Sequence, residues 1–214
     1  MSEEKPRDAW LGEDPLPDRP VGVVRRWLDE AFEARNQDSP HAVALATVEA
    51  DGRPSVRMVL CHTIDEKSGT FTIFTNRESA KGRALSREPR AAIVYNWPGR
   101  QARIEGRIAW TSDEESDAYF ASRPLDARLG AWASRQSEPI ADRSALLARV
   151  EETAARFDAR REEDVLPRPP FWGGLTLTAL SVELWASRAR RIHDRVLWRR
   201  DSTSDTWTPT RLQP

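Results

Sequence analysis

A series of short strand-like segments, separated by turn signals, constrains the fold of this 214-residue chain more than any other feature. Residues 101–110 alternate strictly, with Ile104, Gly106 and Ile108 on one predicted face and charged side chains on the other. Asp51-Gly52 is a strong hairpin signal. Short strands joined by turns predict an antiparallel barrel or sandwich. We expect strands at residues 42–48, 55–62, 71–75, 91–97, 101–110, 175–185, 195–200 and 206–212.

Helical patterns interrupt these strands, so the predicted class is α+β with helices outside a β-barrel. Apolar residues recur at three- and four-residue steps over residues 21–36. Ser112 and Glu115 form a capping box for a further helix. Helices are also expected at residues 78–88 and 142–161. Residues 1–20 are charged and proline-containing, which predicts a mobile N-terminal arm before a single domain at residues 21–214.

Composition excludes several functional classes. Lys and Arg number 33 against 34 Asp and Glu, which argues against a dedicated nucleic-acid binder. No apolar run reaches the roughly 18 residues of a membrane span, and the N-terminus lacks a signal-peptide core, so we expect a cytoplasmic protein. One cysteine and three scattered histidines predict no disulfide and no metal site. Nine tryptophans imply that the core or an interface absorbs many large rings.

No glycine-rich phosphate loop is present, so side chains must hold any bound phosphate. Arg57 lies in the middle of a predicted strand, and Lys81 lies in the first turns of a predicted helix that follows Thr75. Two cations, a strand-end hydroxyl and a helix N-terminus can together form an anion site. The alternative is that Arg57 and Lys81 are solvated surface charges.

Two further segments carry candidate polar groups. If residues 188–195 form a strand, Arg191, His193 and Arg195 share one face, where they could bind an electron-rich or phosphorylated substrate. The alternative is an arginine-rich hairpin that faces water. In residues 122–137, Gln136 and Ser137 could hydrogen-bond a heteroaromatic ring, or the segment is a capped linker helix.

The order of these segments resembles the pyridoxamine 5′-phosphate oxidase family of FMN enzymes. The resemblance runs from about Arg26 to Pro214. It rests on RMVL from Arg57, TNxxSxK ending at Lys81, YFxSRP, GAWASRQS, PPFWGG, ELW, RxHDR and the terminal RLQP, in the family's order. The resemblance implies an antiparallel FMN-binding split β-barrel (Greek-key) and a homodimer with FMN at the subunit interface.

The resemblance also implies a role for individual residues. Cofactor-binding residues would be Arg57, Met58, Val59, Leu60, Phe74, Thr75, Lys81, Gln101, Gln136, Ser137, Trp185 and Arg195. Substrate-binding residues would be His62, Tyr119, Arg123, Arg191 and His193, of which Arg191 and His193 would be catalytic. Arg191 would orient the substrate ring, and Arg195 would stabilise the negative charge of reduced flavin.

The implied reaction is the oxidation of pyridoxamine or pyridoxine 5′-phosphate, a phosphorylated pyridine, to pyridoxal 5′-phosphate, with dioxygen reduced to hydrogen peroxide. The chain departs from the family at His62, where members have a lysine that contacts the substrate phosphate. A neutral histidine weakens that contact. Two alternatives therefore stay open: an FMN oxidase of another aromatic substrate, as in phenazine biosynthesis, and a non-catalytic flavin- or pyridoxal-phosphate-binding protein.

Overall fold

The computed structural model describes residues 8–214, which form eight strands, five α-helices and two short 3₁₀ turns. The strands are β1 (Ala42–Val48), β2 (Pro54–Asp65), β3 (Thr70–Asn76), β4 (Arg90–Trp97), β5 (Arg100–Trp110), β6 (Trp172–Ala186), β7 (Asp194–Arg199) and β8 (Thr208–Leu212). The helices are α1 (Pro20–Ala34), α2 (Ala80–Arg87), α3 (Asp113–Ala121), α4 (Leu125–Ala133) and α5 (Arg143–Phe157). The 3₁₀ turns are η1 (Ala9–Gly12) and η2 (Ala189–Arg191).

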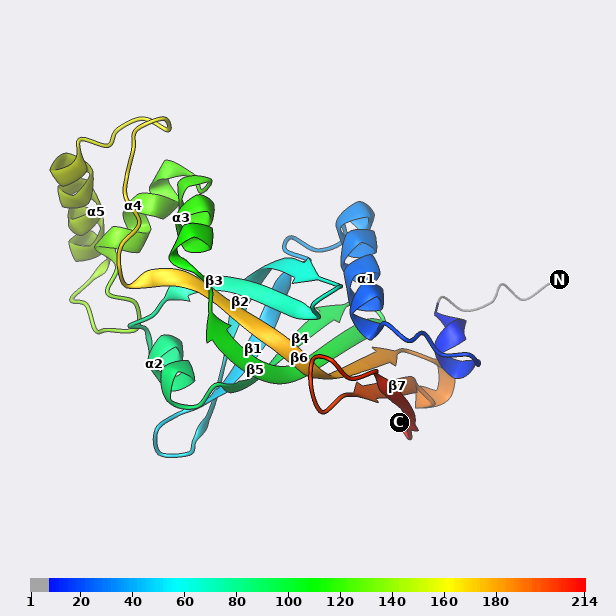
Figure 1. Cartoon of the computed structure of the whole chain (residues 1–214). Helices are drawn as coiled ribbons and strands as arrows, with labels where there is room; N and C mark the ends of the chain where they lie inside the picture. The colour runs from blue at the N-terminus through cyan, green and yellow to red at the C-terminus, as the bar shows by residue number, and fades with distance from the viewer. Residues whose placement is uncertain (1–7) are drawn as a thin grey trace.

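The strands form one antiparallel sheet that closes on itself. The hydrogen-bonded order is β3-β2-β1-β4-β5-β6-β7-β8, and β3 also pairs with β6. The first six strands of this order therefore make a closed barrel, which β7 and β8 extend beyond β6 (Figure 1). This architecture confirms the predicted antiparallel split barrel with flanking helices.

Alternating apolar side chains fill the barrel. Val43 and Leu45 of β1, Ile93 of β4 and Ile104 of β5 are each 0% exposed. The alternation in β5 passes through a bulge at Glu105 and Gly106, where the register to β6 shifts. A Cβ on Gly106 would lie 1.9 Å from the Thr178 carbonyl oxygen, so this close approach requires glycine.

Helices α2 to α5 gather at one end of the barrel, away from α1 and β7 (Figure 1). Helices α3, α4 and α5 contribute to a second, smaller apolar cluster that includes Phe120, Leu129 and Trp172. Ser112 caps α3 by accepting a hydrogen bond from the Glu115 amide at 3.1 Å, as the capping box predicts. Four of the nine tryptophans are buried and five are half-buried, so the barrel and its helices take up much of this aromatic surface.

The structure differs from the expected mobile arm, because residues 8–20 pack against the barrel. Leu11 in η1 is 1% exposed, and Trp198 Nε1 donates to the Pro17 carbonyl at 2.8 Å. Arg211 of β8 donates to the carbonyls of Leu11 and Glu13. The prediction failed because these partners lie about 200 positions away in the chain. The remainder of the expected arm, residues 1–7, lies outside the described residues.

The segment before β7 also differs from its prediction. Residues 188–195 are not one strand, since η2 covers Ala189–Arg191 and β7 begins at Asp194. Arg190 and Arg191 have φ angles of 57° and 62°, in the left-handed region that breaks a strand. Arg191 therefore does not share a strand face with His193 and Arg195. None of the described helices is long and apolar enough to cross a membrane.

Candidate active site in two halves

A polar pocket with Gln136 in its lining forms where the end of β3 meets the start of α2 and the segment after α4, and further polar side chains cluster around Gln136. Lys81 Nζ lies 2.8 Å from Gln136 Oε1 and 3.2 Å from Ser79 Oγ. Thr75 Oγ1 donates to the same Gln136 oxygen at 3.3 Å, and the Ala80 amide donates to Ser137 Oγ at 3.2 Å. The structure thus brings together four of the residues expected to bind the cofactor.

Arg57 of β2 faces the same region with neutral hydrogen-bond partners. Its guanidinium donates to Thr47 Oγ1 at 2.7 Å, to Ser55 Oγ at 2.5 Å and to the Leu45 carbonyl at 3.2 Å. Glu49 forms a longer ion pair with Arg57, at 3.8 Å. Arg57 is therefore an oriented, half-buried cation rather than the solvated surface charge of the alternative interpretation.

The electrostatics of this pocket favour an anionic ligand. The pKa of Lys81 is lowered to about 8, first by burial and second by the positive charge of Arg57. Among residues 8–214, no carboxylate forms an ion pair with Lys81. A buried ammonium that has no carboxylate partner and feels the charge of a second cation is stabilised by a bound anion. The residues present therefore fit a phosphate group.

The local sequence explains how α2 presents its first turn to this pocket. Ser79 is the N-cap and accepts a hydrogen bond from the Gly82 amide at 3.3 Å. A Cβ on Gly82 would lie 2.1 Å from the Arg77 carbonyl oxygen, so only glycine lets the preceding loop approach the helix. Ser137 has a φ of 77°, a strained conformation for a serine that directs its hydroxyl to the start of α2.

An aromatic cluster adjoins the polar pocket on the other side of β3. The Phe74 ring stacks on Tyr119 with centroids 3.8 Å apart and on Trp172 at 5.5 Å. Arg123 lies over the Trp172 ring at 4.8 Å, and its Nη1 atom is buried with no hydrogen-bond partner among the described residues. A buried donor without a partner costs folding free energy, so this Nη1 atom is available to donate a hydrogen bond to an anionic group.

His62 joins the same cluster from β2. Its ring lies 5.0 Å from Tyr119 and 5.6 Å from His41. The pKa of His62 is lowered, first by burial and then by the charges of His41 and Arg123. The lowered pKa favours the neutral imidazole, whereas the lysine that the resemblance implies at this position would carry a full charge. The structure brings His62, Tyr119 and Arg123 together, as the expected substrate subsite requires.

The remaining expected residues gather at the opposite end of the barrel. Gln101, Trp185 and Arg195 are direct cross-strand neighbours on β5, β6 and β7. The His193 ring packs against Trp185 at 4.7 Å. Its Nδ1 atom accepts a hydrogen bond from the Arg188 amide at 3.1 Å, which assigns the proton of the neutral ring to Nε2.

Arg195 is not an isolated cation, because a buried carboxylate holds it. Glu183 accepts hydrogen bonds from Arg195 at 2.8 Å and from Arg103 at 2.6 Å, and the Glu183 side chain is 8% exposed. Arg195 also donates to the Gln213 carbonyl at 3.0 Å. The guanidinium is thereby fixed in direction, and its charge is partly balanced.

One chain does not bring the two halves of this site together. Trp172 and Trp185 lie at opposite ends of β6, about 13 residues and therefore about 40 Å apart along the strand. Figure 1 shows α2 to α4 at one end of the barrel and β7 with the C-terminus at the other. A second copy of the chain is needed if all these residues are to contact one ligand.

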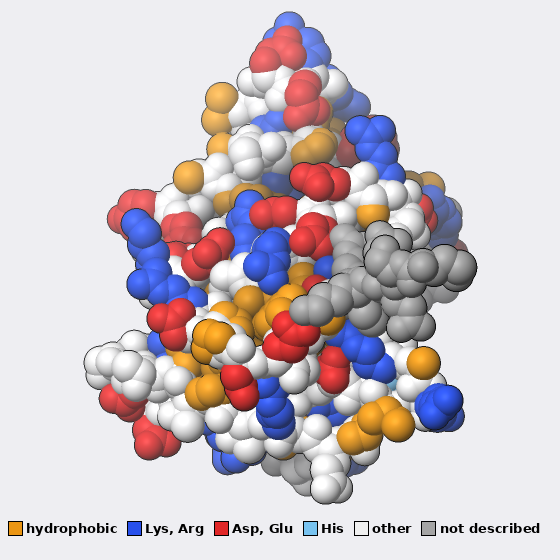
Figure 2. Space-filling model, turned by 90° about the vertical axis from the view of Figure 1, so that its right-hand side faces the viewer, with side chains coloured by type: hydrophobic (Ala, Val, Ile, Leu, Met, Phe, Trp, Pro, Cys, Tyr) orange, Lys and Arg blue, Asp and Glu red, His pale blue; other side chains and the backbone are white. Residues whose placement is uncertain are grey.

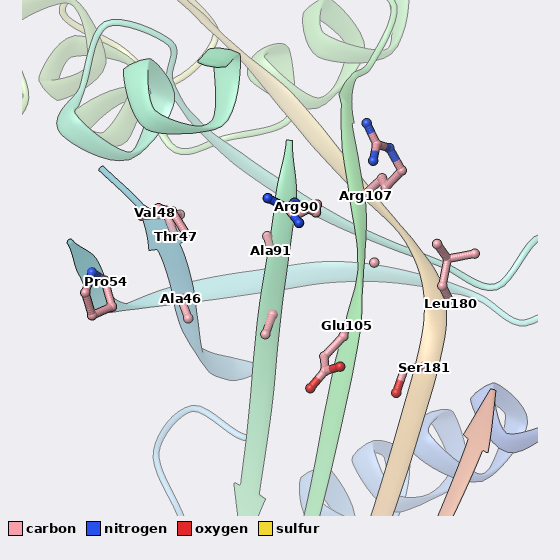
Figure 3. A pocket seen from close by; sticks show the side chains of 12 residues that line it. Ala46, Thr47, Val48, Pro54, Arg90, Ala91, Glu105, Arg107, Leu180 and Ser181 are labelled. Carbon is pink, nitrogen blue, oxygen red and sulfur yellow. The ribbon is translucent and has the colours of Figure 1, made fainter. Parts of the chain in front are cut away.

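The outer barrel face between the two ends carries exposed apolar side chains. Met58 is 64% exposed and Leu60 is 41% exposed, whereas Val59 between them packs against the core. A hollow of about 490 Å³ lies nearby on the outer face of β1, β4, β5 and β6 (Figure 3). Thr47, which Arg57 contacts, lines this hollow, but none of the expected site residues does.

Several residues of these pockets were missed by sequence reasoning. Lys81 contacts Ser79, and Arg57 donates to Thr47 and Ser55. Arg195 pairs with Glu183. Ser79 alone had a local signal, since a serine before a helical segment is a typical N-cap. The other contacts form between strands and have no local signal. Among the described residues, no group of histidine, cysteine or carboxylate side chains could hold a metal ion.

The fold and these pockets define an antiparallel split-barrel protein with a cationic binding pocket beside an aromatic cluster. Residues 28–157 match the family model described as pyridoxamine 5′-phosphate oxidase. Residues 172–214 match the pyridoxine 5′-phosphate oxidase C-terminal dimerisation region. The chain belongs to the pyridoxamine 5′-phosphate oxidase family and is by class an FMN-dependent oxidoreductase.

Curated relatives agree with this assignment over nearly the whole chain. A pyridoxine/pyridoxamine 5′-phosphate oxidase from Burkholderia orbicola is 48% identical over 204 residues, covering 94% of this chain and 91% of the relative. An oxidase of the same description from Cupriavidus taiwanensis is 44% identical over 206 residues, covering 95% and 93%.

Solved structures give the same fold. PhzG from Burkholderia lata, in complex with tetrahydrophenazine-1-carboxylic acid, superposes with a TM-score of 0.84 at 32% identity and 96% coverage of each chain. A pyridoxamine 5′-phosphate oxidase-related, FMN-binding protein from Nostoc punctiforme has a TM-score of 0.70 at 20% identity, covering 94% of this chain and 100% of that one. The second similarity bears on the fold alone.

Proposed function

We propose that the protein is a homodimeric oxidase that converts pyridoxamine or pyridoxine 5′-phosphate to pyridoxal 5′-phosphate. The observation that carries the proposal is the division of the site into a cationic half with Arg57 and Lys81 and an opposite half with Trp185 and Arg195. Each active site would combine the first half of one copy with the second half of its partner. The family match to a dimerisation region supports this arrangement.

In this proposal FMN binds between the two copies. Arg57, Thr75, Lys81, Gln136 and Ser137 would hold its phosphate, and Gln101, Trp185 and Arg195 would border its ring system. When bound, FMN supplies the redox chemistry, as the hydride acceptor for the substrate and the electron donor to dioxygen. The exposed apolar side chains of Met58 and Leu60 would be covered in the dimer.

The protein's own residues would bind and orient the substrate. The unpartnered Nη1 of Arg123 and the Tyr119 hydroxyl would hold the substrate phosphate. His193 would donate a hydrogen bond from Nε2, since its Nδ1 is already an acceptor. Arg191 would lie over the pyridine ring and fix the approach of the reacting carbon.

The first experiment uses the purified full-length protein. A yellow protein with FMN-type absorbance, bleached by pyridoxamine 5′-phosphate in the absence of air and producing hydrogen peroxide in its presence, would agree with the proposal. FMN-loaded protein that does not turn over pyridoxamine 5′-phosphate would contradict it. Tight ligand binding without oxygen consumption would instead identify the non-catalytic binding protein.

A second candidate function is oxidation of another aromatic substrate. It is favoured by His62, which replaces the family's substrate-phosphate lysine, and by the similarity to PhzG in complex with a carboxylated phenazine precursor. The variant His62→Lys separates the two functions. Gain of pyridoxamine phosphate oxidation in His62→Lys over an inactive parent would favour this second candidate, whereas an active parent would favour the first.

A further inference from the structure

The N-terminal segment lies against the loop that carries Arg191 and His193. A Cβ on Gly12 would lie 3.4 Å from Asp194 Oδ1, so residues 8–13 run alongside the start of β7. Figure 2 shows this end of the molecule, where acidic and basic side chains alternate around apolar ones. This contact connects the N-terminal segment, which was expected to be mobile, with the loop that was expected to orient the substrate.

Asp8 connects this segment to the barrel through its side chain. The carboxylate accepts hydrogen bonds from Arg100 Nε at 2.6 Å, from Arg100 Nη2 at 2.9 Å and from Trp27 Nε1 at 3.1 Å. The side chains of Asp8 and Arg100 are 6% and 8% exposed. Arg100 also pairs with Glu30 at 2.6 Å and lies over the Trp27 ring at 5.0 Å. A bidentate, buried pair of this kind fixes the position of Asp8.

The backbone of Asp8 connects to the loop through Arg188. Arg188 Nη2 donates to the Asp8 carbonyl at 2.6 Å, and Arg188 Nε donates to Asp194 Oδ2 at 2.7 Å. The Arg188 amide in turn donates to His193 Nδ1 at 3.1 Å. Asp8, Arg188 and His193 therefore form a continuous chain of hydrogen bonds from the barrel to the imidazole.

The loop needs such support, because its backbone is strained. Arg190 and Arg191 both have positive φ angles, and both side chains are exposed, so η2 has little packing of its own. Conformations of this kind persist only where the surroundings hold them. The contacts of Arg188 with Asp8 and Asp194, on either side of η2, supply that support.

We propose that Asp8 is a positioning residue for the substrate half-site, which holds the Arg191–His193 loop and the His193 imidazole in their productive orientation through Arg188. This inference rests on the proposed function for the roles of Arg191 and His193. Its structural part, the link between Asp8 and His193, stands independently of which substrate the enzyme oxidises.

The test uses full-length protein labelled with ¹⁵N-histidine, in which only His41, His62 and His193 give signals. In the parent protein we expect His193 as the Nε2–H tautomer. In Asp8→Asn, the His193 signals should shift toward an average of both tautomers, while those of His41 and His62 stay in place. Asp29→Asn is the matched control, since it removes an exposed aspartate whose ion-pair partner among the described residues is Arg25, one turn earlier in α1.

Activity gives the second readout. Since a misplacement of about 1 Å can cost on the order of 100-fold in rate, we expect kcat/KM of Asp8→Asn to fall at least about tenfold with FMN affinity unchanged. Asp8→Glu should restore part of the loss. A lower melting temperature with unchanged His193 signals would overturn the proposal, because Asp8 would then be only structural.

One outcome separates this proposal from the proposed function. If the parent oxidises no pyridoxamine 5′-phosphate but Asp8→Asn still shifts His193 alone, the positioning link holds and the function fails. If Asp8→Asn does not fold, Arg188→Lys tests the same link from the loop, because a lysine has a single nitrogen in place of the Nη2 and Nε atoms that bind Asp8 and Asp194. Unchanged His193 signals in Arg188→Lys would then overturn the proposal.

Discussion

At the scale of single residues, Lys81 is the most sensitive reporter of the cationic half-site. Its pKa of about 8 lies below the ordinary value of 10.5, so the free pocket loses this charge as the pH rises through about 8. A bound phosphate raises the pKa of Lys81, so binding takes up a proton above pH 8. We expect FMN affinity to fall on the order of tenfold for each pH unit between pH 8 and pH 9.5. In this range the pH lies above the pKa of Lys81 in the free protein and below its pKa in the phosphate-bound protein.

Calorimetric titration of apoprotein with FMN across this pH range measures the effect. Lys81→Met should bind FMN more weakly at pH 7.5 and lose most of the pH dependence. Lys67→Met is the control, because Lys67 lies in the turn between β2 and β3, away from the pocket. A pH profile that is the same for the parent and for Lys81→Met would rule out Lys81 as a phosphate ligand.

Glu183 is a second residue whose role is visible only in the structure. Its buried carboxylate pairs with Arg103 and Arg195, which are 41% and 31% exposed. We expect Glu183→Gln to lower the free energy of unfolding by about 1–3 kcal/mol, less than for a fully buried pair because water screens both arginines. Urea unfolding measures this, with Glu105→Gln, which removes a half-exposed pair with Arg103, as the control.

At the scale of elements, the first turn of α2 depends on a close approach between the helix and the loop before it. In Gly82→Ala, the new Cβ would meet the Arg77 carbonyl, so the start of α2 must shift. We expect a loss of about 1–3 kcal/mol in unfolding free energy together with weaker FMN binding. In Gly130→Ala of α4, the new Cβ meets no described atom within 4 Å, so stability should rise by about 0.5–1 kcal/mol. Equal effects of both substitutions would contradict this account of α2.

The elements were predictable from sequence where local signals dominate. The alternation of residues 101–110, the Asp51-Gly52 turn and the Ser112 capping box all match the structure. The prediction failed where distant contacts override local preference. Residues 8–20 are held by β7 and β8, and residues 188–193 turn because Arg188 is tied to Asp8 and Asp194.

The candidate site was predictable only in part, for a related reason. The residues around Lys81 are linked by a strand end and a helix start that follow each other in sequence. That Gln136 and Ser137 join them depends on how α4 packs, which no local pattern reports. The pairing of Glu183 with Arg195 and the burial of Arg123 likewise follow from strand register and helix packing.

At the scale of the whole molecule, the proposed function requires two copies of the chain to share each active site. The cationic half and the Trp185 half lie at opposite ends of β6, so under the proposed function neither copy alone would complete a site. Strand β2 carries a surface that a partner would cover, made of the exposed apolar side chains Val56, Met58 and Leu60. We expect a dimer in sedimentation at micromolar concentration, and Met58→Asp should shift it toward the monomer and weaken FMN binding. A monomer that binds FMN with undiminished affinity would contradict the shared site.

Complementation between two inactive variants tests this claim most directly. Lys81→Met disables the cationic half-site and Arg195→Met disables the opposite half-site, so each homodimer should be inactive. When the two variants are mixed, unfolded and refolded together, half of the dimers are mixed, and each mixed dimer contains one intact site. We expect the mixture to recover about one quarter of the parent activity per chain. No recovery in verified mixed dimers would contradict the shared site, because both halves would then belong to a site within one chain.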